Sequence, residues 1–310
     1  MGWTLTKSSA DRWALMYGVI TVLLVVCASL PSLWHHVKSG WDDIGMRMQH
    51  LWEQTLDWIG DDGFKLYVYG MNGWNIVLYW TVGLALLFLE MSAWPKWLIR
   101  YKIQPTVTVD KKRLTSLIAL NLFNQFFVAI PFTIVGYYVL KFQGTSPPIR
   151  ELPTLMRLVV SLAIFVVIQE IVAYYAHRMF HHRLLYKWTH KVHHEWTAPI
   201  ALTAYYNHPL DHLIVNILPS TVGLSFTNAH FFTSWIWLTW ATLRALSDHS
   251  GYNVFKFLLP RRHDFHHHKF TDCFGVWGPL DYLHDTEKLF QANLASLKAK
   301  KKNKAIVSSN

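Results

Sequence analysis

Long apolar stretches constrain this 310-residue chain more than any other feature. A helix needs about 20 apolar residues to cross the hydrocarbon core of a bilayer. Four stretches are long enough for this, at residues 13–34, 74–94, 114–140 and 155–176. Only 15% of the residues are charged, which is also typical of a membrane protein. The sequence therefore predicts an all-α integral membrane protein with four long transmembrane helices.

A fifth apolar stretch, residues 213–246, is too long for a single crossing. Pro219 and Gly223 interrupt it, and "FTNAH" lies near its middle. We expect a membrane hairpin of two short helices. The first stretch, 13–34, has few basic residues before it and no convincing small-residue cleavage site, so we interpret it as an anchor and not as a removed signal peptide.

The distribution of Lys and Arg predicts the orientation of the spans. Residues 95–113 contain six Lys or Arg and one Asp, whereas residues 35–73 contain three Lys or Arg and six acidic residues. Short basic loops stay in the cytosol. The histidine-rich segments at 177–212 and 247–310 are then cytosolic, and 35–73 is lumenal. We expect a multi-pass protein of the endoplasmic reticulum membrane. The net charge of +10 comes largely from loops and a tail beside the membrane, so we predict no nucleic-acid partner.

Histidines are concentrated in the two segments that this topology places in the cytosol. Of 18 histidines, eight lie within 177–212 and four within 263–268. They recur at spacings of three and four residues, which share one face of a helix. We therefore expect each group to direct its imidazoles at one point. Imidazole is a common metal ligand, and the number of candidates suits two metals with open positions. The candidates are His177, His181, His190, His193, His194, His263, His266 and His267.

Several other histidines are open alternatives. His182 replaces His181 as a ligand only if the helix frays, because residues five apart do not share a helix face, so we favour His181. His208 is an additional candidate, either as a ligand or as a hydrogen-bonding partner, and His212 is expected to be structural. His268 lies outside the facial pattern, His284 is undecided, and ordinary surface or core roles are expected for His35, His36, His50 and His230.

Three sequence stretches carry a family resemblance: "HKVHHEWTAPI", "DHSGYN" and "HDFHHHKFTDCFGVWGPLDYLHDT". Together they resemble the fatty acid hydroxylase/sterol desaturase superfamily of membrane di-metal oxygenases. "YKIQP" at 101–105 also favours its C4-methylsterol oxidase branch. We predict three regions: an N-terminal membrane region at 1–94, a catalytic domain at 95–290, and a basic cytosolic tail at 291–310. The catalytic domain would form a cytosolic, histidine-rich helical cap that holds a di-metal site.

The resemblance implies a ligand set and an activity. The eight histidines above match the three histidine boxes of the family, at 177–181, 190–194 and 263–267; His249 matches a further ligand, and His208 matches an "HP" element. Asn253 stands where relatives often carry His or an acid. The implied activity is an iron- and O2-dependent monooxygenation of a 4-methylsterol. Zinc is a possible substitute metal in purified protein, because imidazole binds it well.

The implied electrons come from NAD(P)H through a cytochrome b5-type carrier and its reductase. The chain has no G-x-G-x-x-G fingerprint, so these electrons must come from a partner. The basic residues Lys187, Lys191, Arg261 and Arg262 are candidates for receiving an acidic carrier. Two other functions stay open: a hydroxylase or desaturase of fatty acyl or sphingolipid chains, and a metal-bound, non-catalytic protein of lipid signalling.

Buried acids are expected behind the ligands, because a ligating histidine usually donates its other N–H to a carboxylate or carbonyl. Glu170 lies seven residues before His177, on the same helix face and within an apolar span. A carboxylate inside a span is a functional candidate by default. Further candidates for such support are Asp211, Asp248, Asp264 and, through a water, Asn253.

Overall fold

The computed structural model describes residues 9–28, 31–142, 144, 149–254 and 258–309, which form helices and no strand. Three helical segments within this part of the chain are long and apolar enough to cross a membrane: Lys65–Ser92, Lys111–Phe142 and Leu155–Phe180. They contain the predicted spans at 114–140 and 155–176, and the predicted span at 74–94 except for its last two residues. The prediction of an all-α chain is confirmed, and three of its four long spans are found.

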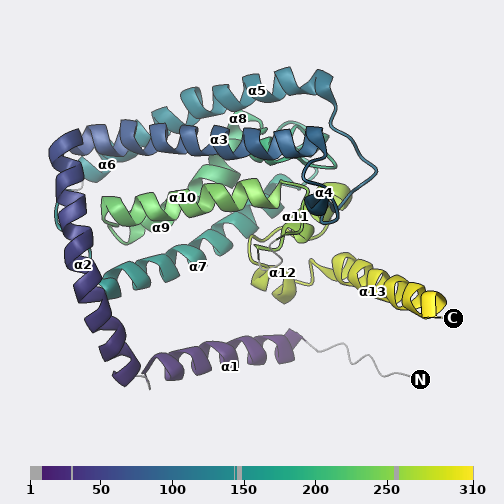
Figure 1. The fold of residues 1–310 in the computed structure, drawn as a ribbon, viewed down its shortest axis with the longest axis horizontal. Helices are drawn as coiled ribbons and strands as arrows, with labels where there is room; N and C mark the ends of the chain where they lie inside the picture. Colours follow the sequence, from purple (N-terminus) through teal and green to yellow (C-terminus); the bar gives the residue numbers. More distant parts are fainter. Residues whose placement is uncertain (1–8, 29–30, 143, 145–148, 255–257, 310) are drawn as a thin grey trace.

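Two of the three long segments enclose two shorter helices (Figure 1). Helices α9 (Leu218–Phe226) and α10 (Phe231–Asp248) lie between α3 (Met71–Ser92) and α7 (Leu155–Phe180). Gly223 of α9 is in close contact with α7, because an added Cβ would lie 2.9 Å from Phe165 Cδ1. The second long segment comprises η2 (Lys111–Arg113), α5 (Leu114–Phe123), η3 (Asn124–Ala129) and α6 (Ile130–Phe142).

Two prolines within apolar stretches each follow a π-helical turn. Pro131 comes after η3, and Pro219 comes after η6 (His212–Ile217). A proline has no N–H, and its ring crowds the carbonyl four residues earlier, which opens the preceding turn. The interruption expected at Pro219 therefore takes the form of local π-helical widening, and Pro131 is preceded by the same feature.

The predicted first span, 13–34, is divided in the structure. Helix α1 (Ser9–Ala28) ends before the end of the predicted span. Helix α2 (Pro31–Ile59) then begins at a proline, a residue that is favoured in the first helical turn. Residues 29 and 30 lie outside the described part of the chain. Neither α1 nor α2 is among the three candidate membrane helices, so a fourth long span is not confirmed.

Helix α2 covers the end of the bundle opposite to α4 (Lys96–Ile99), α11 (Pro260–Lys269) and α12 (Pro279–Leu283) (Figure 1). It buries Trp52 and Leu56 against α10, where the Trp52 ring centroid lies 6.1 Å from that of Phe231. Arg150, after α6, forms ion pairs with Asp57 and Asp61 at the end of α2. The segment expected as a lumenal connection is thus largely one packed amphipathic helix.

The stretch 213–246 forms two helices, as its length suggested. Helix α9 ends at Phe226, and Asn228 adopts a left-handed conformation (φ 45°) between the two helices. His230 starts α10, because its Nδ1 accepts the backbone N–H of Phe232 at 3.0 Å. That this pair lies in a membrane stays a prediction.

Shorter elements connect these helices and complete the chain. The connections contain η1 (Lys65–Gly70), η4 (His193–Glu195), η5 (Ala201–Tyr205) and α8 (Pro209–Asp211). The predicted basic tail forms helix α13 (Lys288–Ser309), and Lys, Ala and Leu in it favour helix formation.

Site-specific labelling will test the predicted topology. Single cysteines at Lys187 and Lys300 should react from the cytosolic side, and one at Asp61 should react from the lumenal side; all three side chains are exposed. The parent chain would carry Cys27→Ser and Cys273→Ala. Labelling of Lys187→Cys and Lys300→Cys from opposite sides would contradict the topology, because the histidine segments on either side of α9 and α10 would then be separated by a bilayer of about 30 Å.

Candidate metal centre

The clustered histidines come from four segments at one end of the bundle. His177 is in the last turn of α7, and His181 caps that helix. His190 lies in the turns that follow, with His193 and His194 in the short η4. His249 caps α10, and α11 carries the remaining three residues, His263, His266 and His267. The second box is therefore built on turns and a 3₁₀ turn, and not on the α-helix that was expected.

The nine histidines form two groups, in each of which the candidate ligand atoms lie within 4.8 Å of one another. Cluster 1 comprises His177, His181, His190, His194 and His266. Cluster 2 comprises His193, His249, His263 and His267.

The expectation that each box points at one locus was wrong. Both "HxxHH" boxes are divided, because His193 separates from His190 and His194, and His266 separates from His263 and His267. On a helix, the side chains of residues i and i+4 differ in direction by about 40°. The side chain of residue i+3 is rotated by about 100° from that of residue i+4. In α11, His263 and His267 are four residues apart and therefore stay together, and His266 turns towards the other cluster. The same division holds on the turns of the second box.

Within each cluster the Nε2 atoms face one another. In cluster 1, Nε2 of His177 lies 3.0 Å from that of His190, and Nε2 of His194 lies 3.1 Å from that of His266. In cluster 2 the Nε2 atoms of His249 and His263 are 2.8 Å apart. These Nε2 atoms therefore line the inside of each cluster.

Six of the nine Nδ1 atoms have an acceptor, whereas that of His194 is buried without one among the described residues. Nδ1 of His190 donates to Asp211 Oδ2 at 2.8 Å. Five further Nδ1 atoms lie beside backbone carbonyls, in the pairs His177–Phe274, His193–Tyr206, His249–Ala245, His266–Asp272 and His267–Trp196, at 2.7–3.3 Å. A carbonyl or carboxylate can only accept, so each of these Nδ1 atoms carries the proton in a neutral ring.

This tautomer leaves an Nε2 lone pair on each of these six rings, directed at the centre of a cluster. In the pair His177–His190 both nitrogens are acceptors, only 3.0 Å apart. Two lone pairs at this distance repel each other unless a cation lies between them. The donor set therefore fits metal ions with imidazole ligands, such as iron or zinc.

The surroundings keep these rings neutral. Burial lowers the pKa values of His190, His194 and His263 well below the usual range, and the neighbouring imidazoles lower them further. Burial lowers the pKa of His249 to about 4. At pH 7 the rings are therefore neutral, and Nε2 is available as a ligand on the six rings whose Nδ1 has an acceptor.

The other predicted histidines lie outside both clusters. His182 is exposed, and its Nδ1 accepts the backbone N–H of Leu184 at 3.4 Å. His208 is half-buried and starts α8, where its Nδ1 accepts the backbone N–H of Leu210. His268 is exposed. The side chains of His35 and His36 lie outside the described residues.

The predicted acidic residues support the site in different ways. Asp211 is bonded directly to His190. Glu170 does not bond to His177, although it lies on the same helix; its carboxylate accepts the backbone N–H groups of Trp277, Gly278 and Leu280. It thereby holds the loop whose residue 274 supplies the carbonyl for His177.

The remaining candidates have other partners. Asp248 pairs with Arg244, which also donates to the carbonyl of Val276. Asp264 accepts from Gln104 Nε2 at 3.0 Å. Asn253 belongs to neither cluster, and its backbone N–H donates to the carbonyl of Tyr101.

The loop between α4 and α5 fixes the second box from outside. Arg113 donates to the carboxylate and to the backbone carbonyl of Glu195. Gln104 Nε2 donates to the carbonyl of Thr197, and the backbone N–H of Ile103 donates to the carbonyl of Gly251. Sequence reasoning missed these contacts, as well as the carbonyl acceptors, because a backbone carbonyl leaves no residue-type signal.

One residue of the predicted basic surface is placed differently. Arg262 is buried and forms ion pairs with Asp281 and Glu287, whereas Lys187 and Lys191 are exposed. Arg262 is therefore a structural residue of the site and does not belong to a docking surface.

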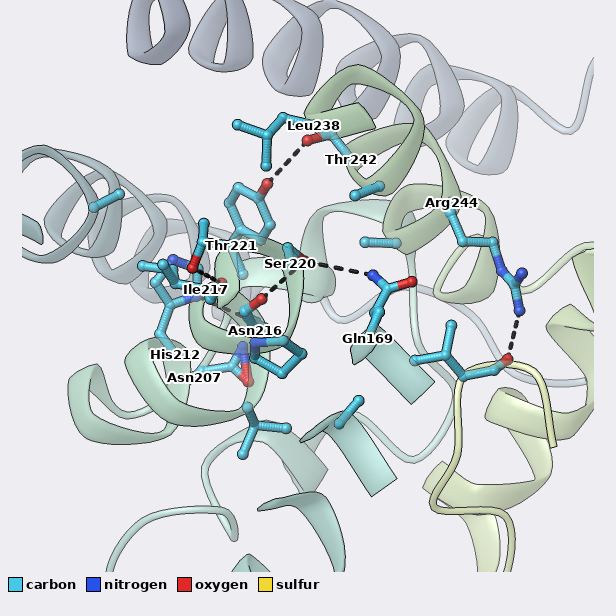
Figure 2. A pocket seen from close by; sticks show the side chains of 18 of the residues that line it. Gln169, Asn207, His212, Asn216, Ile217, Ser220, Thr221, Leu238, Thr242 and Arg244 are labelled. Carbon is cyan, nitrogen blue, oxygen red and sulfur yellow. Dashed lines mark hydrogen bonds between the residues drawn. The ribbon is translucent and has the colours of Figure 1, made fainter. Parts of the chain in front are cut away.

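A cavity of about 240 Å³ connects the histidines with the helix bundle. Its lining includes His177, His193 and His263 on the side of the clusters, and Met71 and Phe132 from the long helices. Polar side chains lie between them, and Figure 2 shows several of these, among them Gln169, Asn207, His212 and Asn216. The cavity therefore offers a mainly apolar ligand a position beside both clusters.

Comparisons with known proteins agree with this arrangement. Residues 162–286 match the family model "Fatty acid hydroxylase", and this range contains all nine clustered histidines. Fatty acid hydroxylase domain-containing protein 2 from Macaca fascicularis is 34% identical over 296 residues, covering 94% of this chain and 89% of that protein. The human protein of the same name is 33% identical over the same shares.

A more distant relative carries an enzymatic name. Methylsterol monooxygenase 1 from Danio rerio is 32% identical over 213 residues, covering 65% of this chain and 72% of that protein. No solved structure matches the chain significantly. The family match and the extent of the similarity show that this chain belongs to the fatty acid hydroxylase family, whose members include lipid oxidoreductases.

Proposed function

We propose that the chain is a membrane-bound lipid monooxygenase that uses O2 and two iron ions held by the nine clustered histidines. One observation carries the proposal: histidine Nε2 atoms from separate segments meet at 2.8–3.3 Å beside a cavity that enters the helix bundle. Family membership supports the lipid substrate. When bound, the irons would supply the reduction of O2 and the oxidation of an unactivated C–H bond.

The protein's own contribution is to position the ligands and the substrate. Asp211 and the backbone carbonyls fix the tautomer and the orientation of the imidazoles, which strengthens them as ligands. The apolar part of the cavity, including Met71 and Phe132, binds the lipid and limits the access of water. His177 and His263 line the same cavity, so the reacting carbon would lie next to the clusters.

We propose a sterol of the 4-methylsterol type as the substrate, which is supported by the similarity to Methylsterol monooxygenase 1. A fatty acyl or sphingolipid substrate is the second candidate. It is favoured by the similarity to "Fatty acid hydroxylase ahd1" from Mycosarcoma maydis, which is 33% identical over 77% of this chain and 62% of that protein.

The proposal includes an electron donor and a cellular location. Electrons from NAD(P)H would arrive through a cytochrome b5-type carrier on the cytosolic face, where Lys187 and Lys191 are exposed. The protein would reside in the endoplasmic reticulum membrane with both clusters facing the cytosol.

Metal analysis tests the proposed centre. We expect two metal ions per chain in purified protein, iron in active material, with zinc as a substitute, and we expect a chelator to remove them together with the activity. The measurement is elemental analysis of protein whose concentration is known from amino-acid analysis. One metal or none per chain, with all nine histidines intact, would contradict the assignment.

The lipid profile of cells that lack the protein tests the substrate. A sterol oxidase predicts accumulation of a methylated sterol precursor, and restoration by the wild-type chain but not by His266→Ala. Accumulation of unhydroxylated acyl or sphingolipid species, with unchanged sterols, would support the second candidate instead.

A further inference from the structure

Three π-helical segments contribute to the wall of the cavity. Tyr67 of η1, Gln125 of η3 and His212 of η6 all line it. π-Helical turns are rare and are frequent at functional sites, because the widened turn redirects a side chain. Segments η3 and η6 pack against each other, and each precedes a proline that opens the turn. The two polar residues at these turns belong to neither histidine cluster.

Gln125 contributes an unpartnered donor to this wall. The residue is only 3% exposed, and its Oε1 accepts Trp80 Nε1–H at 2.8 Å. An indole nitrogen can only donate, so this bond fixes which end of the amide is oxygen. The amide nitrogen, Nε2, is buried and has no hydrogen-bond partner among the described residues. A buried N–H without an acceptor is costly, which indicates that a ligand completes it.

His212 presents a second donor to the same cavity. The ring is 2% exposed and lies against Tyr205, with centroids 5.0 Å apart. Asn216 Nδ2 lies 3.1 Å from the carbonyl of Ala204, which fixes the orientation of the amide, and the same nitrogen donates to His212 Nδ1 at 3.2 Å. Figure 2 shows His212 and Asn216 in this contact.

The contact with Asn216 determines the tautomer of His212. Burial lowers the pKa of His212 to about 3, so the ring is neutral at pH 7. Because Nδ1 accepts, the single proton is on Nε2. In the described part of the chain, no residue accepts a hydrogen bond from this Nε2.

We propose that Gln125 and His212 form a subsite that binds a hydrogen-bond-accepting oxygen of the lipid. The inference rests on the proposed function, because it assumes that the lipid occupies this cavity. The shared chemistry is one oxygen on an otherwise apolar molecule, either the 3-oxygen of a sterol or the carbonyl of an acyl ester or amide. This subsite would select oxygenated lipids against pure hydrocarbons and fix which carbon lies beside the histidines.

Equilibrium binding to the full-length protein in nanodiscs tests the subsite. The probes are two matched pairs: cholesterol with its 3-deoxy analogue, and methyl oleate with a hydrocarbon of equal length. For the pair that matches the natural ligand, wild type should bind the oxygenated member about three- to tenfold more tightly, which corresponds to one or two neutral hydrogen bonds. Gln125→Met and His212→Phe should each reduce this ratio towards one and leave binding of the deoxygenated member nearly unchanged.

Gln169→Met is the matched control. Gln169 also lines the cavity, but its Nε2 already donates to Ser220 Oγ, so the substitution removes no free donor. Its binding ratio should stay at the wild-type value. Discrimination of the sterol pair alone assigns the oxygen to a sterol, and discrimination of the ester pair alone assigns it to an acyl group; either result supports the subsite.

Other results would overturn the subsite. These are equal binding within both pairs by wild type, an unchanged ratio in both Gln125→Met and His212→Phe, or an equal loss in Gln169→Met. The readout needs neither metal nor turnover. Retained discrimination in a protein without oxygenase activity would therefore reject the proposed function and leave the subsite intact.

Discussion

Replacing His266 by alanine is expected to abolish lipid oxidation and to empty cluster 1. His266 is fully buried, and its Nε2 lies 3.1 Å from that of His194. Loss of groups that merely support a ligand costs about 10- to 100-fold in metal affinity or activity, so loss of a ligand should cost more than about 100-fold in activity. His193→Ala should have the same effect through cluster 2. Turnover with a supplied electron donor and metal content per chain are the two measurements.

Three control variants separate ligand loss from general damage. His182→Ala, at an exposed side chain, and His35→Ala should keep near-normal turnover and two metals. His230→Ala removes a helix cap, so it should cost about 1 kcal/mol of stability but keep turnover near normal. If all five variants turned over lipid equally, the clusters would not be the active site.

Replacing Glu170 by alanine is expected to destabilise the protein by about 3 kcal/mol or more. The variant would leave three backbone N–H groups, of Trp277, Gly278 and Leu280, without their acceptor in a buried site. Each unsatisfied buried donor costs about 1–3 kcal/mol. The loosened loop also carries the carbonyl of Phe274, so metal affinity of cluster 1 should fall with the stability.

Thermal unfolding in detergent, together with metal content, measures this effect. Gly275→Ala should act in the same direction, since an added Cβ would lie 2.6 Å from Glu170 Oε1. Glu151→Ala, at an exposed side chain, should change stability by less than about 0.5 kcal/mol. Equal melting temperatures for Glu170→Ala and Glu151→Ala would show that the carboxylate does not hold the loop.

The parts of the fold that were predictable from sequence are those that follow from local composition. The long helices ending at Ser92, Phe142 and Phe180 are runs of apolar residues, and only their length was needed to find them. Helix α2 was missed because its apolar face becomes visible only beside its tertiary partners, such as Trp52 against Phe231. Its pattern alone does not distinguish an amphipathic helix from a polar connection.

The histidines of the candidate site were found because their density is a strong signal, but their grouping was not. Spacing alone suggested that His190 and His193 share a target, yet they lie in different clusters, and His263 and His266 of helix α11 are divided in the same way. Asp211 was predicted as a partner from its place beside the boxes, and it bonds to His190. The role of Glu170 was missed because its three acceptor bonds reach a loop more than 100 residues away in sequence.

The division of the boxes between the clusters has a consequence for how the two metals would load. The segment His190–His194 and helix α11 each supply residues to both clusters. On the proposed assignment, the first ion would hold these two segments in place and so lower the ordering cost of the second. A ligand that orders a shared element makes the next binding event easier. Titration of metal-free protein should therefore show positive cooperativity between the two ions, with few singly occupied chains at half saturation.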